Sequence, residues 1–328
     1  MKPKHLLYIL LCLQCLSCEE VLEYDFENSE RHVVVNGLPC ADSTLFVNLT
    51  YSRFFLDNQP FVPVEDATVT LSVDGAAPLD GSRNGANWSF NYVAHGGEVL
   101  TLHVSIPGRD AITAQTHVPA LPDMTTPTAE IDTLQPIDAG DILFTLNDPA
   151  DEQNYYYIYV HEHDSGTRWN RWEQKWDTID TVVYAYFNCL DLQISDPSVN
   201  VTTGLFGYFS RLMFSDSLID GTLHDMKISL VMPKDTAEHP LQREYTLVVE
   251  SLSPEAFRYH KDLIATQSIT QYFAEPSQVY SNIQGALGIF AGIAIRSYPL
   301  TFVYKEQPSE PPLGFPPHRA DRWEGRRP

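Results

Sequence analysis

The feature that most constrains the fold is an alternation of apolar and polar residues in short runs over residues 31–118. In the run ATVTLSV, Val69, Leu71 and Val73 fall on one face of an extended strand, because successive side chains point to opposite sides. Gly, Pro, Asn and Asp separate the runs, as in strands joined by turns. The pattern predicts an immunoglobulin-like β-sandwich over this region.

The second half of the chain also has strand character. Runs such as DILFTLN, VVYAYFNC and MKISLVMP are rich in β-branched and aromatic residues. One helix is expected near residues 254–271, because Ser253 is a favourable N-cap and Pro254 suits the first helical position. We therefore expect a mainly β protein, with a second β-rich domain over residues 129–305 that contains one helix.

Two proline-rich segments lack apolar periodicity. PALPDMTTPT, residues 119–128, is expected to be a linker between the two domains. Residues 306–328 are dense in proline and end in a basic cluster, so we expect a disordered tail.

The N-terminus has the layout of a secretory signal. Lys2 and Lys4 precede an apolar run over residues 6–13, which is too short for the about 20 residues that a membrane-spanning helix needs. We expect residues 1–17 to be a cleaved signal peptide of the lipoprotein type.

Cys18 is the expected lipidation site. It follows Leu16 and the small residue Ser17, whereas Cys12 and Cys15 lack a small residue immediately before them. The alternative is an ordinary signal peptide cut near Ser17. Lipid at Cys18 would anchor the chain to a membrane, with the acidic segment 18–30 as a tether.

The charge balance excludes some partners. The chain has 21 Lys and Arg against 43 Asp and Glu, and loss of Lys2 and Lys4 with the signal leaves 19 − 43 = −24. Such a surface repels nucleic acid. We expect no nucleic-acid partner and no cofactor.

Four segments together are similar to a known family: CEEVLEYDFENSERHVVVNG, NDPADEQNYYYIYV, FSDSLIDG and EPSQVYSNIQGALGIFAGIAI. They resemble the outer-membrane lipoproteins of domain of unknown function 4249 over about Cys18 to Tyr304. The resemblance implies a lipoprotein of Bacteroidota that faces the cell exterior and assists a TonB-dependent receptor in nutrient uptake. It supplies no catalytic residues.

The run RWNRWEQKW places Trp169, Trp172 and Trp176 among basic residues. Their spacing of three and then four would put all three on one buried face of a short helix. Alternatively the indoles are exposed and contact a partner protein or a glycan, because Trp beside Arg is typical of interfaces.

Cys40 and Cys189 remain after loss of the signal. One lies in each predicted domain, so they are candidates for a disulfide, with two buried free thiols as the alternative.

Metal binding is a weaker hypothesis at two places. His161 and His163 alternate on one side of a strand, but no third ligand motif accompanies them, and a polar strand end also explains them. Asp148, Asp151 and Glu152 lack the spacing of an EF-hand loop and are typical of a turn. We predict no metal site.

Gly285, Gly288 and Gly292 do not form a phosphate-binding loop, because the required order of strand, loop and helix is missing. We expect a buried strand, bent at glycines, against the sheet of the second domain.

Motifs of nucleophilic catalysis are absent from the sequence. We therefore predict no catalytic residues. Together with the family resemblance, this implies a non-enzymatic accessory of a TonB-dependent receptor. An independent glycan-binding or adhesin module that uses the three tryptophans is the alternative, and a surface hydrolase is a third hypothesis without a motif.

Overall fold

The computed structural model describes residues 31–54, 57–132, 139–191, 193–194, 209–232, 241–266 and 278–304. The predicted signal peptide, the lipidation site Cys18, the acidic tether and the tail at 306–328 lie outside the described residues. Within the described part the protein is mainly β, with one helix, as predicted.

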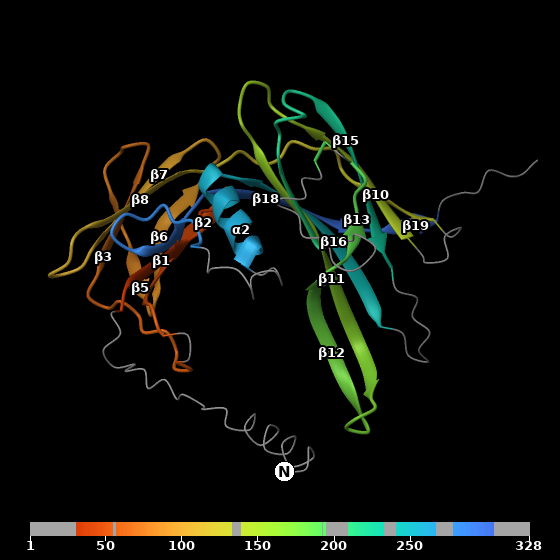
Figure 1. The fold of residues 1–328 in the computed structure, drawn as a ribbon, viewed down its shortest axis with the longest axis horizontal. Coiled ribbons are helices and arrows are strands. Elements are labelled where there is room, and N and C mark those ends of the chain that lie inside the picture. Colours follow the sequence, from red (N-terminus) through yellow and green to blue (C-terminus); the bar gives the residue numbers. More distant parts are fainter. Residues whose placement is uncertain are drawn as a thin grey trace, which may run out of the picture.

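The N-terminal half forms a sandwich of two sheets, here called the first sandwich (Figure 1). The first sheet has the order β17 (Leu287–Phe290), β1 (Val33–Gly37), β2 (Ser43–Tyr51), β6 (Asn87–Ala94) and β5 (Ser82–Asn84). The second has the order β4 (Leu79–Asp80), β3 (Thr68–Val73), β7 (Val99–Ser105) and β8 (Ile112–His117). Val69 and Leu71 are buried between the sheets, which confirms the face predicted from their alternation.

Two further sheets form the second sandwich. One has the order β13 (Phe187–Asn188), β15 (Leu223–Val231), β10 (Ala139–Asn147), β9 (Thr128–Asp132) and β19 (Phe302–Tyr304). The other has the order β12 (Lys175–Tyr184), β11 (Tyr155–Asn170), β16 (Gln242–Leu252) and β18 (Ile293–Leu300), with β14 (Arg211–Ser215) also paired to β11. Their core includes Phe144, Ile158, Ile228 and Leu247, all buried.

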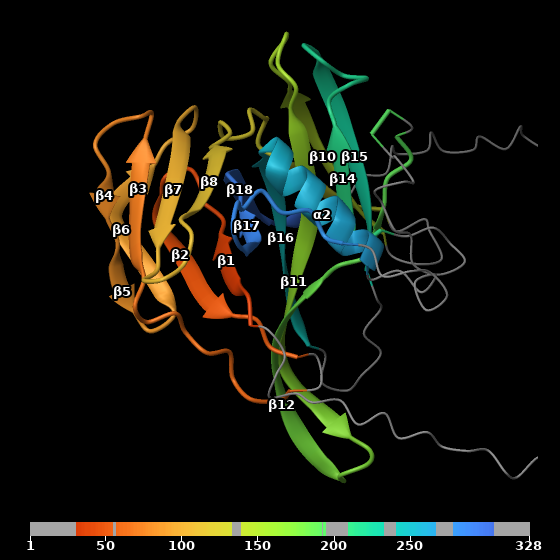
Figure 2. The ribbon, with the colours of Figure 1, turned by 60° about the vertical axis from the view of Figure 1, so that its left-hand side comes forward.

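The single described helix, α2 (Pro254–Thr266), begins where the sequence predicts. The hydroxyl of Ser253 accepts a hydrogen bond from the backbone N–H of Ala256 at 3.2 Å, which caps the first turn. Residues 267–271 of the predicted helix lie outside the described part. Figures 1 and 2 show α2 between the two sandwiches, where it covers a third cluster of buried residues.

Residues 282–294, here called the connecting segment, join the two sandwiches. Strand β17 within it runs parallel to β1, so the prediction that the glycine-rich run packs only on the second domain's sheet is wrong for residues 287–290. Gly288 has φ of 109°, and a Cβ there would lie 2.0 Å from the carbonyl oxygen of Val35. The backbones therefore approach closely where the sequence has glycine.

The candidate disulfide between Cys40 and Cys189 is not formed, and of the alternative of two buried free thiols only Cys189 is fully buried. Cys40 and Cys189 are both free thiols. Cys189 is buried in the core of the second sandwich, whereas Cys40 lies beside Ile293 of the connecting segment. The two cysteines belong to separate packing clusters, which is why they do not pair.

Candidate binding site

A long hairpin projects from the second sandwich. Strand β16 accompanies β11 only as far as Ser165, and beyond this point β11 pairs with β12 alone. We call the protruding residues 166–179 the arm. Figures 1 and 2 both show β11 and β12 extending past the neighbouring strands.

Asn170 organises the turn at the end of the arm. Its Oδ1 atom accepts the N–H groups of Trp172 at 3.0 Å and Glu173 at 3.1 Å, and its Nδ2 donates to Asp177 at 2.7 Å. Asn side chains stabilise turns in this way by bonding to backbone two or three residues further on. The turn therefore presents Trp172 at the tip in a defined backbone conformation.

The three tryptophans lie on this arm, and the helical interpretation of their spacing is wrong. Trp169 and Trp176 are directly opposite each other on β11 and β12, with ring centroids 5.5 Å apart and an interplanar angle of 64°. They are 43% and 52% exposed, and Trp172 is 96% exposed. The seven-residue interval from Trp169 to Trp176 therefore contains a hairpin turn and not two turns of a helix.

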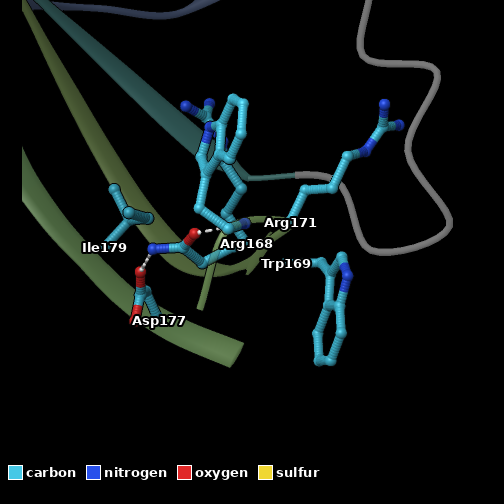
Figure 3. Close-up of a pocket in the computed structure, with 7 residues that line it drawn as sticks. Arg168, Trp169, Arg171, Asp177 and Ile179 are labelled. Carbon is cyan, nitrogen blue, oxygen red and sulfur yellow. Dashed lines mark hydrogen bonds between the residues drawn. The ribbon is translucent and has the colours of Figure 1, made fainter. Parts of the chain in front are cut away.

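Trp169 and Trp172, but not Trp176, border a shallow hollow of about 330 Å³ (Figure 3). Its lining residues are Arg168, Trp169, Asn170, Arg171, Trp172, Asp177 and Ile179. Within the described residues no ion pair involves either arginine, whereas Lys175 pairs with Glu173 at 2.6 Å. Two guanidinium groups beside exposed indoles can donate hydrogen bonds to a partner's carboxylates or hydroxyls.

A second hollow, of about 420 Å³, lies nearer the body, on the sheet face that carries His161, His163 and Val182. His161 and His163 both line it, as expected for alternate residues of one strand. His163 lies 2.8 Å from Asp180 and 3.7 Å from Glu244, and the hydrogen bond to Asp180 raises the pKa of His163. The polar partners of His163 in this structure are therefore carboxylates. The predicted strand end at these histidines is wrong, because β11 continues to Asn170.

Strand β11 also carries a row of aromatic residues that was not predicted from the sequence. Tyr157, Tyr159 and His161 alternate on one face, with centroid separations of 5.3 and 4.9 Å between successive rings. Tyr184 of β12 packs against His161 at 5.3 Å. The period of two in NYYYIYVHEH was the available signal. The row joins the buried cluster beneath α2 to the base of the exposed hairpin.

Glu250 of β16 is buried beside this row, opposite Tyr157, and accepts a hydrogen bond from the Tyr159 hydroxyl at 2.7 Å. Burial raises the pKa of Glu250, so the folded chain holds this proton more tightly than the unfolded chain. Protonated Glu250 contributes its full stabilisation at pH values below the pKa that it has in the unfolded chain. This contribution is lost as pH rises through its pKa in the folded chain.

We expect Glu250→Gln to stabilise the protein more at about pH 8 than at about pH 4, because Gln stays neutral and can still accept from Tyr159. The melting temperature of both chains at the two pH values measures this. Glu65→Gln, at a side chain 74% exposed, is the control and should not change the difference between the two pH values. Equal pH dependence in wild type and Glu250→Gln would contradict the assignment.

An acidic cluster forms away from the arm. Asp148, Asp216 and Asp220 bring carboxylate oxygens within 4.8 Å of one another, while the predicted neighbours Asp151 and Glu152 do not join them. The two buried carboxylates already have protein donors. The Tyr156 hydroxyl donates to Asp148 at 2.6 Å, and the backbone N–H of Asn154 donates to Asp216 at 2.6 Å.

No helix in the described part of the chain has the length and apolar character of a membrane span. A family profile described as Domain of unknown function (DUF4249) matches residues 19–298. The chain belongs to this family. The match covers the strands of both sandwiches except β19 and the last two residues of β18, so the DUF4249 region includes the arm.

Comparisons with other proteins add little to the description of this DUF4249 protein. No curated protein matches it. The B domain of a biofilm associated protein matches at 6% identity and a TM-score of 0.20, covering 81% of this chain and 85% of that chain. The BSP domain of a biofilm associated protein matches at 8% identity and a TM-score of 0.21, covering 86% and 61%. TM-scores this low carry no argument about function.

Proposed function

We propose that this protein is a non-enzymatic binding protein, lipid-anchored at Cys18 on the outer face of the outer membrane, which uses the arm to hold a TonB-dependent receptor. The observation that carries the proposal is the exposure of three tryptophans at the end of a projecting hairpin, with Trp172 96% exposed. Large exposed aromatic groups of this kind are uncommon without a binding role.

The arrangement of the arm supports a protein partner. Trp and Arg supply much of the energy of protein interfaces, and both occur here around one hollow. The Trp169–Trp176 pair and the Asn170 turn fix the side chains before binding, which lowers the conformational entropy lost on association.

The location in this proposal comes from the sequence. The apolar run before Cys18 and the acidic residues after it have the layout of an exported lipoprotein, and acyl chains contribute about 0.8 kcal/mol per buried CH₂ to membrane attachment. The family resemblance gives the TonB-dependent receptor as the candidate partner.

The proposal predicts that replacing Trp169, Trp172 and Trp176 together with Ala weakens receptor binding by roughly 100-fold or more. The measurement is co-purification of the receptor with the lipidated, tagged chain, followed by titration of the isolated components. The variant should stay folded, because a cross-strand aromatic pair contributes only about 1 kcal/mol.

Phe46→Ala is the matched control, since Phe46 is 62% exposed but lies on the first sandwich. It should bind like wild type. Undiminished binding by the triple variant would contradict a role of the arm, and the absence of any co-purified receptor would contradict the choice of partner.

A glycan ligand is the second candidate. The hollow combines indole faces with the side chains of Asn170 and Asp177, a combination that can stack on a sugar ring and bond to its hydroxyls. Binding of the wild type, but not of the triple variant, to an oligosaccharide array in the absence of a receptor would favour this candidate.

A further inference from the structure

Among the described strands, β12 is the last in its sheet and lies at the outer edge of the hairpin. Within the described residues it is ten residues long and pairs only with β11. We propose that this edge receives an extended segment of the partner protein as an additional β-strand. The inference rests on the proposed function and specifies how a protein partner would be held.

The alternation of hydrogen-bonded pairs between β11 and β12 shows which backbone groups of β12 point outward, where an added strand could bond to them. The backbone N–H of Ala185 donates to the carbonyl of Val160 at 2.8 Å, and the register places these two residues opposite each other. Hydrogen-bonded and non-hydrogen-bonded pairs alternate along an antiparallel ladder. Between Thr178 and Tyr184, the β12 residues whose N–H and C=O groups point away from β11 are therefore Thr178, Asp180, Val182 and Tyr184.

The side chains on this edge are unusual for a strand in water. Val182 is 60% exposed, Val183 is 48% exposed and Tyr184 is 42% exposed. Neighbouring residues of a strand point to opposite faces, so apolar groups are exposed on both faces at once. Natural edge strands are usually protected by proline, lysine or a bulge, and the run TIDTVVY at 178–184 has neither proline nor lysine.

Charge complementarity indicates the chemistry of the incoming strand. Asp180 is the one charged residue in this run, and its side chain is 79% exposed. The whole chain carries a net charge of −22, so a second copy would be repelled. The segment that fits has apolar residues beside Val182 and Tyr184 and a Lys or Arg beside Asp180.

A photo-cross-linking amino acid, p-benzoylphenylalanine, placed at Thr178 of the full lipidated chain tests the proposal in the organism that encodes it. The expected adduct joins Thr178 to one contiguous, basic and apolar segment of another polypeptide. Val182→Pro removes one outward N–H and should lower the adduct yield about 10-fold. Val182→Ala keeps that N–H and should lower it less than about threefold.

Two further measurements test whether the hairpin stays folded in Val182→Pro and whether its outer amides become protected in the complex. The circular dichroism couplet of the Trp169–Trp176 pair should persist in Val182→Pro. In the unsubstituted complex, amide exchange of Thr178, Asp180 and Val182 should slow at least about 10-fold, while the inward amides of Thr181 and Val183 are already protected in the free chain.

The outcomes separate this inference from the proposed function. Receptor binding that needs the tryptophans but is unaffected by Val182→Pro would overturn the inference and leave the proposed function intact. A proline-sensitive adduct with a polypeptide that is not a receptor would support the inference and contradict the choice of partner. No adduct, an adduct with lipid, or an adduct with a second copy of this chain would overturn the inference.

Discussion

Gly292→Ala is expected to lower the free energy of unfolding by more than about 3 kcal/mol. A Cβ at this position would lie 2.2 Å from the carbonyl oxygen of His117 and 2.8 Å from the Cα of Val118. Both are backbone atoms, so no side-chain rotation relieves the overlap. The strands must separate at the point where the connecting segment passes from the first sandwich to the second.

Hydrogen bonds at this position add to the expected cost. The N–H of Gly292 donates to the Thr116 hydroxyl at 2.9 Å, and its carbonyl accepts the N–H of Ser253 at 2.9 Å. Ser253 also caps α2, so displacement of Gly292 should disturb the helix as well. Urea unfolding followed by tyrosine and tryptophan fluorescence measures the effect.

The control is Gly108→Ala. Gly108 has φ of 77°, but a Cβ there meets nothing within 4 Å. The loss in free energy of unfolding for Gly108→Ala comes only from placing Ala in the left-handed backbone conformation, about 1–2 kcal/mol. A Gly292 variant no less stable than the Gly108 variant would show that the backbone contact is not required.

Asn282→Ala is expected to cost about 2–3 kcal/mol, the second largest effect. The Asn282 Nδ2 donates to the carbonyls of Gln115 at 3.0 Å and Phe290 at 2.6 Å, and Oδ1 accepts the N–H of Phe290 at 3.0 Å. Phe290 is fully buried, so its backbone groups would lose their partner where replacement by water is difficult.

A comparison with Asn48→Ala isolates the effect of burial. Asn48 bonds to Asn87 at 2.8 Å across two strands, but this hydrogen bond is exposed to solvent. Its loss should cost less than about 1 kcal/mol, because water can replace the partner. Equal midpoints for the two variants in urea unfolding would contradict the role assigned to Asn282.

Local patterns predicted the local structure well. The alternation in ATVTLSV gave the buried face of β3, and the Ser253-Pro254 pair gave the start of α2. Both depend on the geometry of a few neighbouring residues, which sequence order fixes directly. The tryptophans were identified as candidate contacts from residue type alone.

The arrangement of the candidate site was less predictable. A spacing of three and then four residues fits a helical face, but here it spans the Asn170 turn and brings Trp169 and Trp176 together across two strands. Whether the tryptophans share a helical face or lie on a projecting hairpin depends on where β16 stops pairing with β11, at Ser165. That pairing joins residues far apart in the sequence.

The sequence by itself determined the strand character of both halves and the cap of the single helix, because each rests on contacts between near neighbours in the chain. Only the tertiary structure decided that residues 287–290 return to pair with β1, that Cys40 and Cys189 stay apart, and that the tryptophans project into solvent. These outcomes depend on how strands distant in sequence pack to bury apolar surface, and no local pattern encodes that packing.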